Sequence, residues 1–517
     1  MTGSLPPAFL EKMKTILEEE FSGFIASYEA ERLYGLRVNE LKLSAQQWKE
    51  LSPFGGQTRP IPWTSGAGMY VKEGVRPGKH PHYHAGLYYI QEPSAMAPVE
   101  LLDVLPGQRV LDLCAAPGGK STQIAAKLQG RGVLVTNDNA KERTKALAKN
   151  VELAGVRNAI ICNEEPSRLV ETFRGWFDRI LVDAPCSGEG MFRKDESMIA
   201  EWEKHSVEQC SSMQRTILRD AAAMLAPGGK LVYSTCTFSP EENEAQIAAL
   251  LAERPDFEVA AIEPRWGWKP GRPDLAGCSG LLEGERLRSI EGTARLWPHH
   301  IEGEGHYAAL LCRKGGAAKE NALASGEAPD AEVGRRLKRK DAKPAGKQPH
   351  KPGKGRGGAD KGKQAGLQDD DAVEIWRANA ESIVQGALAW ESRVIAYGAR
   401  IYIQPPGVPP LDGLRIVRPG WYVGEGIRGR LEPSQPLAMG LKREEAVRSI
   451  NWSSADERTL RYLKGETVFA EDMDIAVQGD ASPKGYVLVC ADGYPIGWGK
   501  YADGMLKNML PAGWRWM

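Results

Sequence analysis

Apolar and polar positions alternate with two different periods through the middle of the chain, between Gln108 and Lys314. Short apolar runs typical of strands lie at residues 109–113, 133–137, 159–162, 179–183, 230–234 and 307–312. Segments with helical spacing of apolar residues lie at 120–128, 141–154, 208–225 and 240–253. Because strands alternate with helices, this pattern predicts an α/β domain with a mostly parallel, doubly wound sheet.

The last of these helices has a well-marked start. Ser239 is a capping residue, Pro240 suits the first helical position, and Glu242 stands three residues after the cap. This combination is typical of a capped helix N-terminus, so the sequence predicts a helix that begins at Pro240.

The two ends of the chain show other patterns. Residues 9–20 form an amphipathic helical pattern, and 36–43 and 86–90 are expected strands, which together predict a small α/β module. After Asp371 the expected strands, such as 400–403 and 486–490, lie among frequent Gly and Pro. We expect a separate, largely β domain at this end of the chain.

A low-complexity segment separates the middle from the C-terminal part. Residues 315–370 contain almost no large apolar side chains, so this segment cannot bury a core. Between 335 and 363 it carries twelve Lys or Arg against two Asp, a net charge of +10. Two interpretations stay open: the segment is a solvated linker, or it is a tether that also binds phosphate groups of a nucleic acid. The expected domains are therefore 1–105, 106–314 and 371–517, with 315–370 between the last two.

Composition narrows the class of protein. The 517 residues include 67 Lys or Arg and 67 Asp or Glu, so the net charge is zero. Eight cysteines without a CxxC pair, and no apolar leader, favour a reduced, cytoplasmic protein without disulfides. No apolar stretch is long enough for a membrane span. We expect a monomer.

Two cysteines follow strand-like runs. Cys186 comes after the apolar run that ends at Asp183, and Cys236 comes after the run that ends at Ser234. Ligands bind at the carboxyl edge of an open α/β sheet, so two thiols at this edge are equipped for covalent chemistry.

A turn of small residues at 114–119 follows the first strand of the sheet. Such a turn lets backbone N–H groups approach a ligand at a helix N-terminus. It is neither GxGxxG nor a phosphate-binding P-loop, because Cys114 stands where the P-loop needs glycine. The next strand ends at Asp138, where a carboxylate can accept the hydroxyls of a ribose. The sequence therefore favours a cofactor site at this edge.

Five motifs together resemble one family. These are YYIQEPSAM at 88–96, CAAPGGKS at 114–121, VDAPCSGEG at 182–190, PGGKLVYSTCTFSPEENE at 227–244 and RLWPHHIEGEGHY at 295–307. They are similar to the NOL/NOP/Sun class of RNA cytosine-5 methyltransferases. GRLEPSQPLAMGL at 429–441 and GYPIGWGK at 493–500 resemble the C-terminal extension of its RsmF type, which acts on 16S rRNA. The resemblance implies a Rossmann-like class I methyltransferase domain, an RRM-like N-terminal module and a PUA-like C-terminal domain, the last two binding RNA.

The resemblance also implies S-adenosylmethionine as the cofactor. Its methionine and ribose side would lie against Cys114, Ala115, Ala116, Pro117, Gly118, Gly119 and Lys120. Asp138 would hold the ribose hydroxyls, with Arg143 nearby and Asp183 at the same site. An acid after the third strand would contact the adenine. Counting from Asp138 favours Glu165, and Glu164 is the alternative.

The two thiols receive separate roles from the resemblance. Cytosine C5 is a poor nucleophile, so a thiolate must first add to C6. The resemblance assigns this addition to Cys236 and product release to Cys186, which is also a candidate base for the C5 proton. Asp183 would face the N3 and N4 edge of the cytosine. We expect Lys120 beside Asp183, where its charge would hold the carboxylate ionised or lower the pKa of a thiol.

Two other functions are also compatible with these motifs. A DNA cytosine-5 methyltransferase would use Cys186 as its nucleophile, which leaves Cys236 without a role. A non-enzymatic ribosome assembly factor would need neither thiol. His80, His82 and His84 have spacing that could suit zinc, but no Cys or acid cluster adjoins them, so we expect no metal. The expected partner is ribosomal RNA or the small ribosomal subunit, with the decoding region of 16S rRNA as the implied target.

Overall fold

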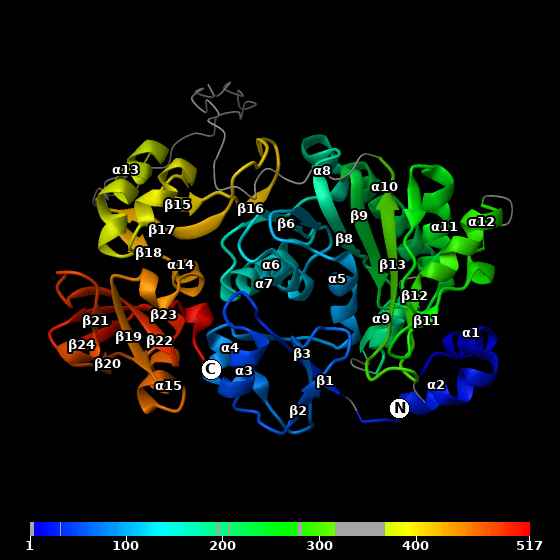
Figure 1. Cartoon of the computed structure of the whole chain (residues 1–517), viewed down its shortest axis with the longest axis horizontal. Coiled ribbons are helices and arrows are strands. Elements are labelled where there is room, and N and C mark those ends of the chain that lie inside the picture. The colour runs from blue at the N-terminus through cyan, green and yellow to red at the C-terminus, as the bar shows by residue number, and fades with distance from the viewer. Residues whose placement is uncertain are drawn as a thin grey trace, which may run out of the picture.

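The computed structural model describes residues 5–31, 33–193, 197–204, 207–277, 282–315 and 368–516. A central sheet with helices on its faces has the N-terminal sheet module below it and the C-terminal region at its left in the view of Figure 1. The basic run at 335–363 lies outside the described residues. Its role as a phosphate-gripping tether therefore stays a prediction.

The central sheet is the predicted doubly wound sheet. Five strands run parallel in the order β7-β6-β5-β8-β9, and β13 pairs antiparallel with β9. The strands are β5 (Arg109–Asp112), β6 (Val133–Asn137), β7 (Ala159–Cys162), β8 (Phe177–Asp183), β9 (Leu225–Thr235) and β13 (His306–Arg313). The main covering helices are α5 (Ala97–Leu102), α6 (Gly119–Leu128), α7 (Lys141–Leu153), α8 (Pro166–Phe173), α10 (Val207–Met224) and α11 (Glu244–Glu253). The strand order reverses between β5 and β8, which is where such sheets bind ligands.

The predicted helix start at Ser239 is wrong. Residues Pro240–Glu242 form a single 3-10 turn, Asn243 has φ −114° and ψ −97°, and α11 begins only at Glu244. The Ser239 hydroxyl does not cap the helix but donates to Glu189 Oε1 at 2.7 Å. The polar residues of this segment therefore belong to a buried network, described below, and not to a helix cap.

The N-terminal sheet has the topology that the resemblance implies. Its strands β1 (Tyr34–Val38), β2 (Thr58–Pro60), β3 (Gly68–Val71) and β4 (Tyr88–Ile90) are antiparallel in the order β2-β3-β1-β4. With α3 (Ala45–Leu51) and α4 (Pro81–His84), the element order is βαββαβ, as in RRM-like folds. The strand expected at 36–43 ends at Val38, because Asn39 opens a turn and donates its side-chain amide to Gly86 O and Ala154 O.

The first helices pack on the central domain. The amphipathic pattern forms α1 (Pro7–Leu17) and a 3-10 turn, followed by α2 (Phe21–Ser27). Phe24 of α2 packs edge-on against Phe238 at 5.4 Å between ring centroids. Because Phe238 follows Cys236 by two residues, these helices support the segment that carries a candidate catalytic thiol.

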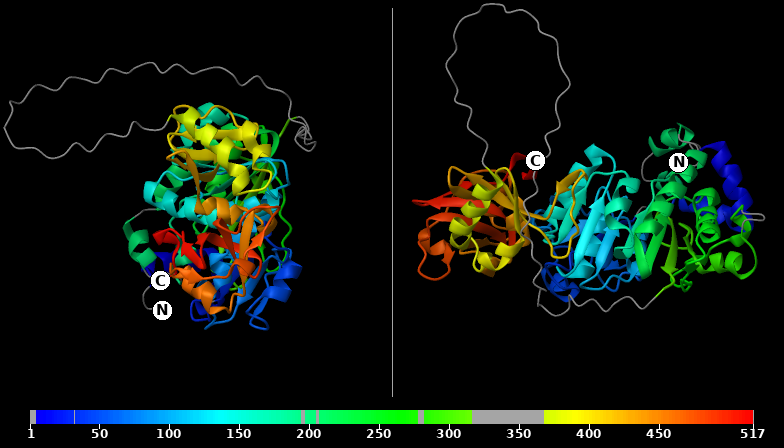
Figure 2. Two further views of the ribbon diagram at one scale, coloured as in Figure 1. Left: turned by 90° about the vertical axis from the view of Figure 1, so that its left-hand side faces the viewer. Right: turned by 90° about the horizontal axis from the view of Figure 1, so that it is seen from above.

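The C-terminal region differs from the single β domain expected there, because it contains two sheets. The first holds β14 (Val394–Tyr397), β15 (Arg400–Ile403), β17 (Trp421–Ile427) and β18 (Arg430–Pro433). The second holds β19 (Arg448–Trp452), β20 (Val468–Phe469), β21 (Ala476–Val477), β22 (Gly485–Ala491), β23 (Tyr494–Ala502) and β24 (Met505–Asn508). One short strand, β16 (Ile416–Arg418), leaves this region and pairs antiparallel with β7 at the edge of the central sheet (Figure 2).

Two of the three candidate zinc histidines contact the C-terminal region. His80 caps α4, accepting a hydrogen bond from the His82 backbone. His82 Nε2 lies 2.8 Å from Asp492 Oδ2, and the His84 ring stacks on Trp516. His82 and His84 thus contact different residues of the C-terminal region, whereas the contacts of His80 lie within the N-terminal module. Among the described helices, none is long and apolar enough to cross a membrane.

A buried ion pair joins α11 to the strand before β13. The Arg295 and Glu244 side chains are 3% and 0% exposed, and Arg295 Nε donates to Glu244 Oε1 at 2.6 Å. Arg295 also donates to Phe238 O at 2.9 Å. Removing one partner from such a pair leaves the other charge buried and uncompensated.

We therefore expect Glu244→Ala to lower the free energy of unfolding by about 3–5 kcal/mol, measured from urea unfolding of the central domain. The matched control is Glu253→Ala, at the other end of α11. Its pair with Arg219 is 42% and 56% exposed, so the expected loss is below about 1 kcal/mol. Equal losses from both substitutions would contradict the prediction.

Candidate active site

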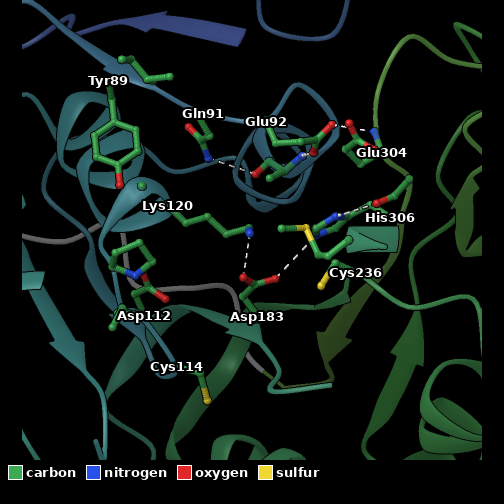
Figure 3. A pocket seen from close by; sticks show the side chains of 18 residues that line it. Tyr89, Gln91, Glu92, Asp112, Cys114, Lys120, Asp183, Cys236, Glu304 and His306 are labelled. Atoms are coloured by element: carbon green, nitrogen blue, oxygen red, sulfur yellow. Dashed lines mark hydrogen bonds and ion pairs between the residues drawn. The ribbon is translucent and has the colours of Figure 1, made fainter. Parts of the chain in front are cut away.

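A cavity of about 240 Å³ opens at the carboxyl ends of β5, β8 and β9 (Figure 3). Its lining comes from the β5–α6 turn, the end of β8, the segment after β9, and residues of β4 and the start of β13. These lining residues are Tyr89, Ile90, Gln91, Glu92, Ala95, Asp112, Cys114, Ala115, Ala116, Pro117, Gly119, Lys120, Asp183, Met191, Cys236, Glu304, Gly305 and His306. Of the residues that the sequence singled out, most of the β5–α6 turn, Asp183 and Cys236 therefore share one cavity, with part of the N-terminal sheet beside it.

The β5–α6 turn has the shape expected of a cofactor loop. Gly118 has φ +110°, a conformation that favours glycine, and a Cβ there would lie 3.2 Å from Leu147. Asp112 at the end of β5 lines the cavity and is fully buried. Its Oδ2 accepts a hydrogen bond from Ser121, while Oδ1 has no hydrogen-bond partner among the described residues, and burial raises the pKa of Asp112 to about 7. This unpartnered oxygen is suited to accept a hydrogen bond from a cationic group in the cavity.

Asp138 and Arg143 hold the same turn from the side of β6. Asp138 Oδ2 accepts from Ala116 N at 3.2 Å, and Arg143 donates to Ala116 O at 2.8 Å. Neither side chain lines the cavity. Their contact with the turn is thus observed, whereas the contact of Asp138 with a ribose stays a prediction.

The two acids considered for the adenine have different surroundings. Glu165 is exposed at the start of α8 and accepts from Asn139 at 3.3 Å. Glu164 is buried and bound by Arg415 of the C-terminal region. Neither acid lines the cavity, so Glu165 as the adenine contact stays a prediction.

The two candidate thiols lie together. Cys186 Sγ and Cys236 Sγ are 3.4 Å apart, and of the two only Cys236 lines the cavity. The hydrogen bond to Cys236, together with burial, raises the pKa of Cys186 well above its ordinary value. Cys186 therefore keeps its proton while Cys236 faces the cavity.

Asp183 occupies the centre of the site. Lys120 Nζ donates to its Oδ2 at 2.7 Å, which confirms the expected neighbour, and Ser234 Oγ donates to Oδ1 at 2.8 Å. His306 Nε2 lies 3.5 Å from Oδ1. Burial acts to raise the pKa of Asp183, but Lys120 and His306 outweigh it and hold the pKa below its ordinary value. The same pair raises the pKa of Lys120 above its ordinary value, against the effect of burial. A charged ion pair thus faces the cavity.

Two buried carboxylates that were not expected at the site from the sequence, Glu189 and Glu242, hold the thiol-bearing segments. Glu242 accepts from Ser187 N at 2.9 Å and from Ser187 Oγ at 2.5 Å, directly after Cys186. Glu189 accepts from Thr237 Oγ1 and from Phe238 N, each at 2.9 Å, directly after Cys236. A hydrogen bond of 2.8 Å between the Ser187 and Thr237 hydroxyls joins the two segments. This network explains how two loops can hold their sulfur atoms in contact.

His306 is the other site residue that the sequence analysis left without a role. It lies at the start of β13, is 4% exposed, and lines the cavity beside Asp183. Glu189, Glu242 and His306 all fall within motifs that carried the family resemblance. Their place in these motifs was the feature of the sequence that could have identified them as site residues. The contacts of their side chains, however, are visible only in three dimensions.

Sequence models of protein families match four parts of the chain. Residues 5–93 match the N-terminal domain of the 16S rRNA methyltransferase RsmF, and 99–312 match the 16S rRNA methyltransferase RsmB/F. Residues 380–441 match the first C-terminal domain of RsmF, and 452–516 match the RsmF PUA domain. The two C-terminal matches correspond to the two sheets seen there.

Individual proteins agree with these matches. The ribosomal RNA small subunit methyltransferase F of Vibrio vulnificus strain YJ016 is 32% identical over 524 residues, covering 98% of this chain and 97% of that protein. The protein of the same name from Serratia proteamaculans strain 568 is 38% identical over 307 residues, covering 57% of this chain and 64% of its own length.

Solved structures support the fold of more than half of the chain. PH0851 is 28% identical with a TM-score of 0.53, and the match covers 59% of this chain and 66% of that one. NSun6 from Pyrococcus horikoshii is 20% identical with a TM-score of 0.50, and the match covers 60% of this chain and 99% of that one. At this identity the similarity supports the fold only. The resemblance deduced from the motifs is thus confirmed, and the chain belongs to the RsmF family of 16S rRNA methyltransferases.

Proposed function

We propose that this protein methylates C5 of a cytosine in 16S rRNA, with S-adenosylmethionine as the methyl donor and Cys236 as the nucleophile. The observation that carries the proposal is the position of Cys236. Its thiol faces the same cavity as the Lys120–Asp183 pair, and a second thiol lies 3.4 Å behind it. Membership of the RsmF family supports the RNA substrate.

The cavity has features that fit the cofactor. The unpartnered Asp112 Oδ1 suits the ammonium group of a bound amino acid moiety, and the glycine turn at Gly118 lets backbone N–H groups approach it. Asp138, beside the turn, is the residue we assign to the ribose hydroxyls. When bound, S-adenosylmethionine supplies an electrophilic methyl group.

The first half of the reaction uses Cys236 and Asp183. The Cys236 thiolate adds to C6 of the cytosine, which makes C5 nucleophilic. Asp183, kept ionised by Lys120, accepts a hydrogen bond from the cytosine N4 amino group and holds the ring against the thiolate. The base must leave its stack to reach the cavity, as in other enzymes that modify nucleobases.

The second half uses Cys186. While Cys236 carries the negative charge, its hydrogen bond and charge keep the proton on Cys186. Once Cys236 is bonded to C6, it no longer holds that charge, so the principal cause that raises the pKa of Cys186 is removed. Cys186 can then release its own proton to solvent, and the resulting thiolate removes the C5 proton, which expels the Cys236 thiolate and regenerates the aromatic ring.

The DNA alternative has less support. It would make Cys186 the nucleophile, yet Cys236 and not Cys186 lines the cavity. A non-enzymatic assembly factor would not need the buried carboxylates that hold both thiol-bearing segments in place.

Trapping of a covalent adduct tests the proposal. We expect Cys186→Ala, incubated with cofactor and 16S rRNA, to accumulate a denaturant-resistant protein–RNA adduct, because the C5 proton is no longer removed. Cys236→Ala should form none, and Cys210→Ala, a change at a buried cysteine away from the cavity, should behave as the wild type. Adducts would be detected by gel electrophoresis in denaturant. The opposite pattern, or adducts formed only with DNA, would refute the assignment.

Methylation of free 16S rRNA and of purified small subunits, measured side by side, identifies the preferred form of the substrate.

The role of Lys120 is tested separately through the pH dependence of the rate. Lys120→Met removes the charge that lowers the pKa of Asp183, and burial then raises that pKa. If ionised Asp183 is required, activity is lost as the pH falls through its pKa. The acidic limb of the kcat profile, at saturating cofactor, should therefore move to higher pH by at least about one unit. Lys120→Arg, which keeps the charge, should move it less. An unchanged profile in Lys120→Met would exclude this role.

A further inference from the structure

The C-terminal region reaches into the central sheet beside the cofactor half of the site. Strand β16 pairs with β7, with Ile416 opposite Cys162 and Arg418 opposite Ile161. The carboxyl end of β7 leads directly into Asn163 and Glu164. The segment around β16, about 250 residues after Glu164 in the sequence, therefore lies beside the edge where the adenine end of the cofactor is expected.

Arg415, directly before β16, holds Glu164 with both its backbone and its side chain. The Arg415 N–H donates to Glu164 Oε1 at 2.7 Å, and the guanidinium donates to Oε2 at 3.1 Å. Arg415 O also accepts from Asn163 N at 2.9 Å. The Glu164 side chain is 4% exposed, and although burial acts to raise its pKa, Arg415 holds that pKa below the ordinary value.

These contacts continue from Glu164 to the cofactor turn. Asn137 exchanges two hydrogen bonds with the Glu164 backbone, each of 2.9 Å, and donates to Leu113 O at 3.1 Å. Asn163 donates its side-chain amide to Asp138 O at 2.8 Å. Asp138 in turn accepts from Ala116 N in the β5–α6 turn. One continuous set of hydrogen bonds thus joins the C-terminal segment to the loop and the acid assigned to the cofactor.

We propose that Arg415 is a positioning residue for the cofactor, through which the C-terminal region completes the cofactor half of the site. The inference rests on the proposed function, because it assumes that Asp138 and the β5–α6 turn hold S-adenosylmethionine. Arg415 itself does not line the cavity, so it acts through Glu164 and the Asn137–Asp138 turn. The physical reason is that a buried carboxylate keeps its place only while it is paired and hydrogen-bonded.

The neighbouring Arg418 provides a matched control on the same strand. Its Nε donates to Glu152 Oε1 at 2.7 Å, and Glu152 lies on α7. This pair also ties β16 to the central domain, but neither residue bonds to Glu164, Asn137 or Asp138 in the described contacts. A variant at Arg418 therefore loosens the attachment of β16 without removing the partner of Glu164.

The experiment measures the binding of S-adenosylmethionine to the full-length protein by calorimetry, without RNA, for the wild type, Arg415→Ala, Arg418→Ala and Glu164→Ala. We expect Arg415→Ala to raise the Kd by about five- to tenfold, as for other residues that orient a ligand-binding group. Arg418→Ala should stay within about twofold of the wild type. The double variant Arg415→Ala/Glu164→Ala should bind no more weakly than Glu164→Ala alone, because the two residues act as a unit.

Steady-state kinetics separate positioning from general damage. For Arg415→Ala the rise in cofactor KM should exceed any fall in kcat, and the KM for RNA should change less than the KM for cofactor. An unchanged Kd in Arg415→Ala, or equal weakening in Arg415→Ala and Arg418→Ala, would overturn the inference. A wild-type protein that binds no S-adenosylmethionine in the same titration would instead overturn the proposed function.

Discussion

The ion pair between Lys120 and Asp183 is the interaction on which the arrangement of the site depends. It joins the β5–α6 turn to the end of β8, across the point where the order of the sheet reverses. Both side chains are largely buried, and each shifts the pKa of the other toward the charged form. Because breaking such a pair leaves one charge without its partner, the β5–α6 turn and the end of β8 are held at a fixed separation.

The thiols depend on a second set of buried charges. Glu242 and Glu189 are fully buried, and each accepts several hydrogen bonds from the segment that follows one of the cysteines. A loop that carries a nucleophile at the surface of a sheet would otherwise be mobile. Here the carboxylates satisfy the backbone N–H groups of both loops, so two sulfur atoms can stay in contact without a covalent bond.

The flanking domains also take part in the site. Arg37 of β1 is 3% exposed and donates to Gly119 O at 2.8 Å and to Thr122 Oγ1 at 2.7 Å, which fixes the N-terminal sheet on the start of α6. Tyr89 and Gln91 line the cavity from the end of that sheet. The C-terminal region contacts the β7 edge of the central sheet through β16. Modules expected only to bind RNA therefore also complete the walls and supports of the central cavity.

The sequence by itself determined the features that are local along the chain. Strand and helix periods predicted the central sheet, and the small residues at 114–119 predicted the turn between β5 and α6, which lines the cavity. Cys186 and Cys236 were found because each follows an apolar strand, and parallel strands bring their carboxyl ends together.

Only the tertiary structure decided which distant groups are paired. Ser239 looked like a helix cap, but its hydroxyl donates to Glu189, 50 residues away. His82 is paired with Asp492 and Glu164 with Arg415, across 410 and 251 residues. A short sequence pattern records propensity and spacing, whereas the partner of a buried polar group depends on which surfaces meet when the domains pack.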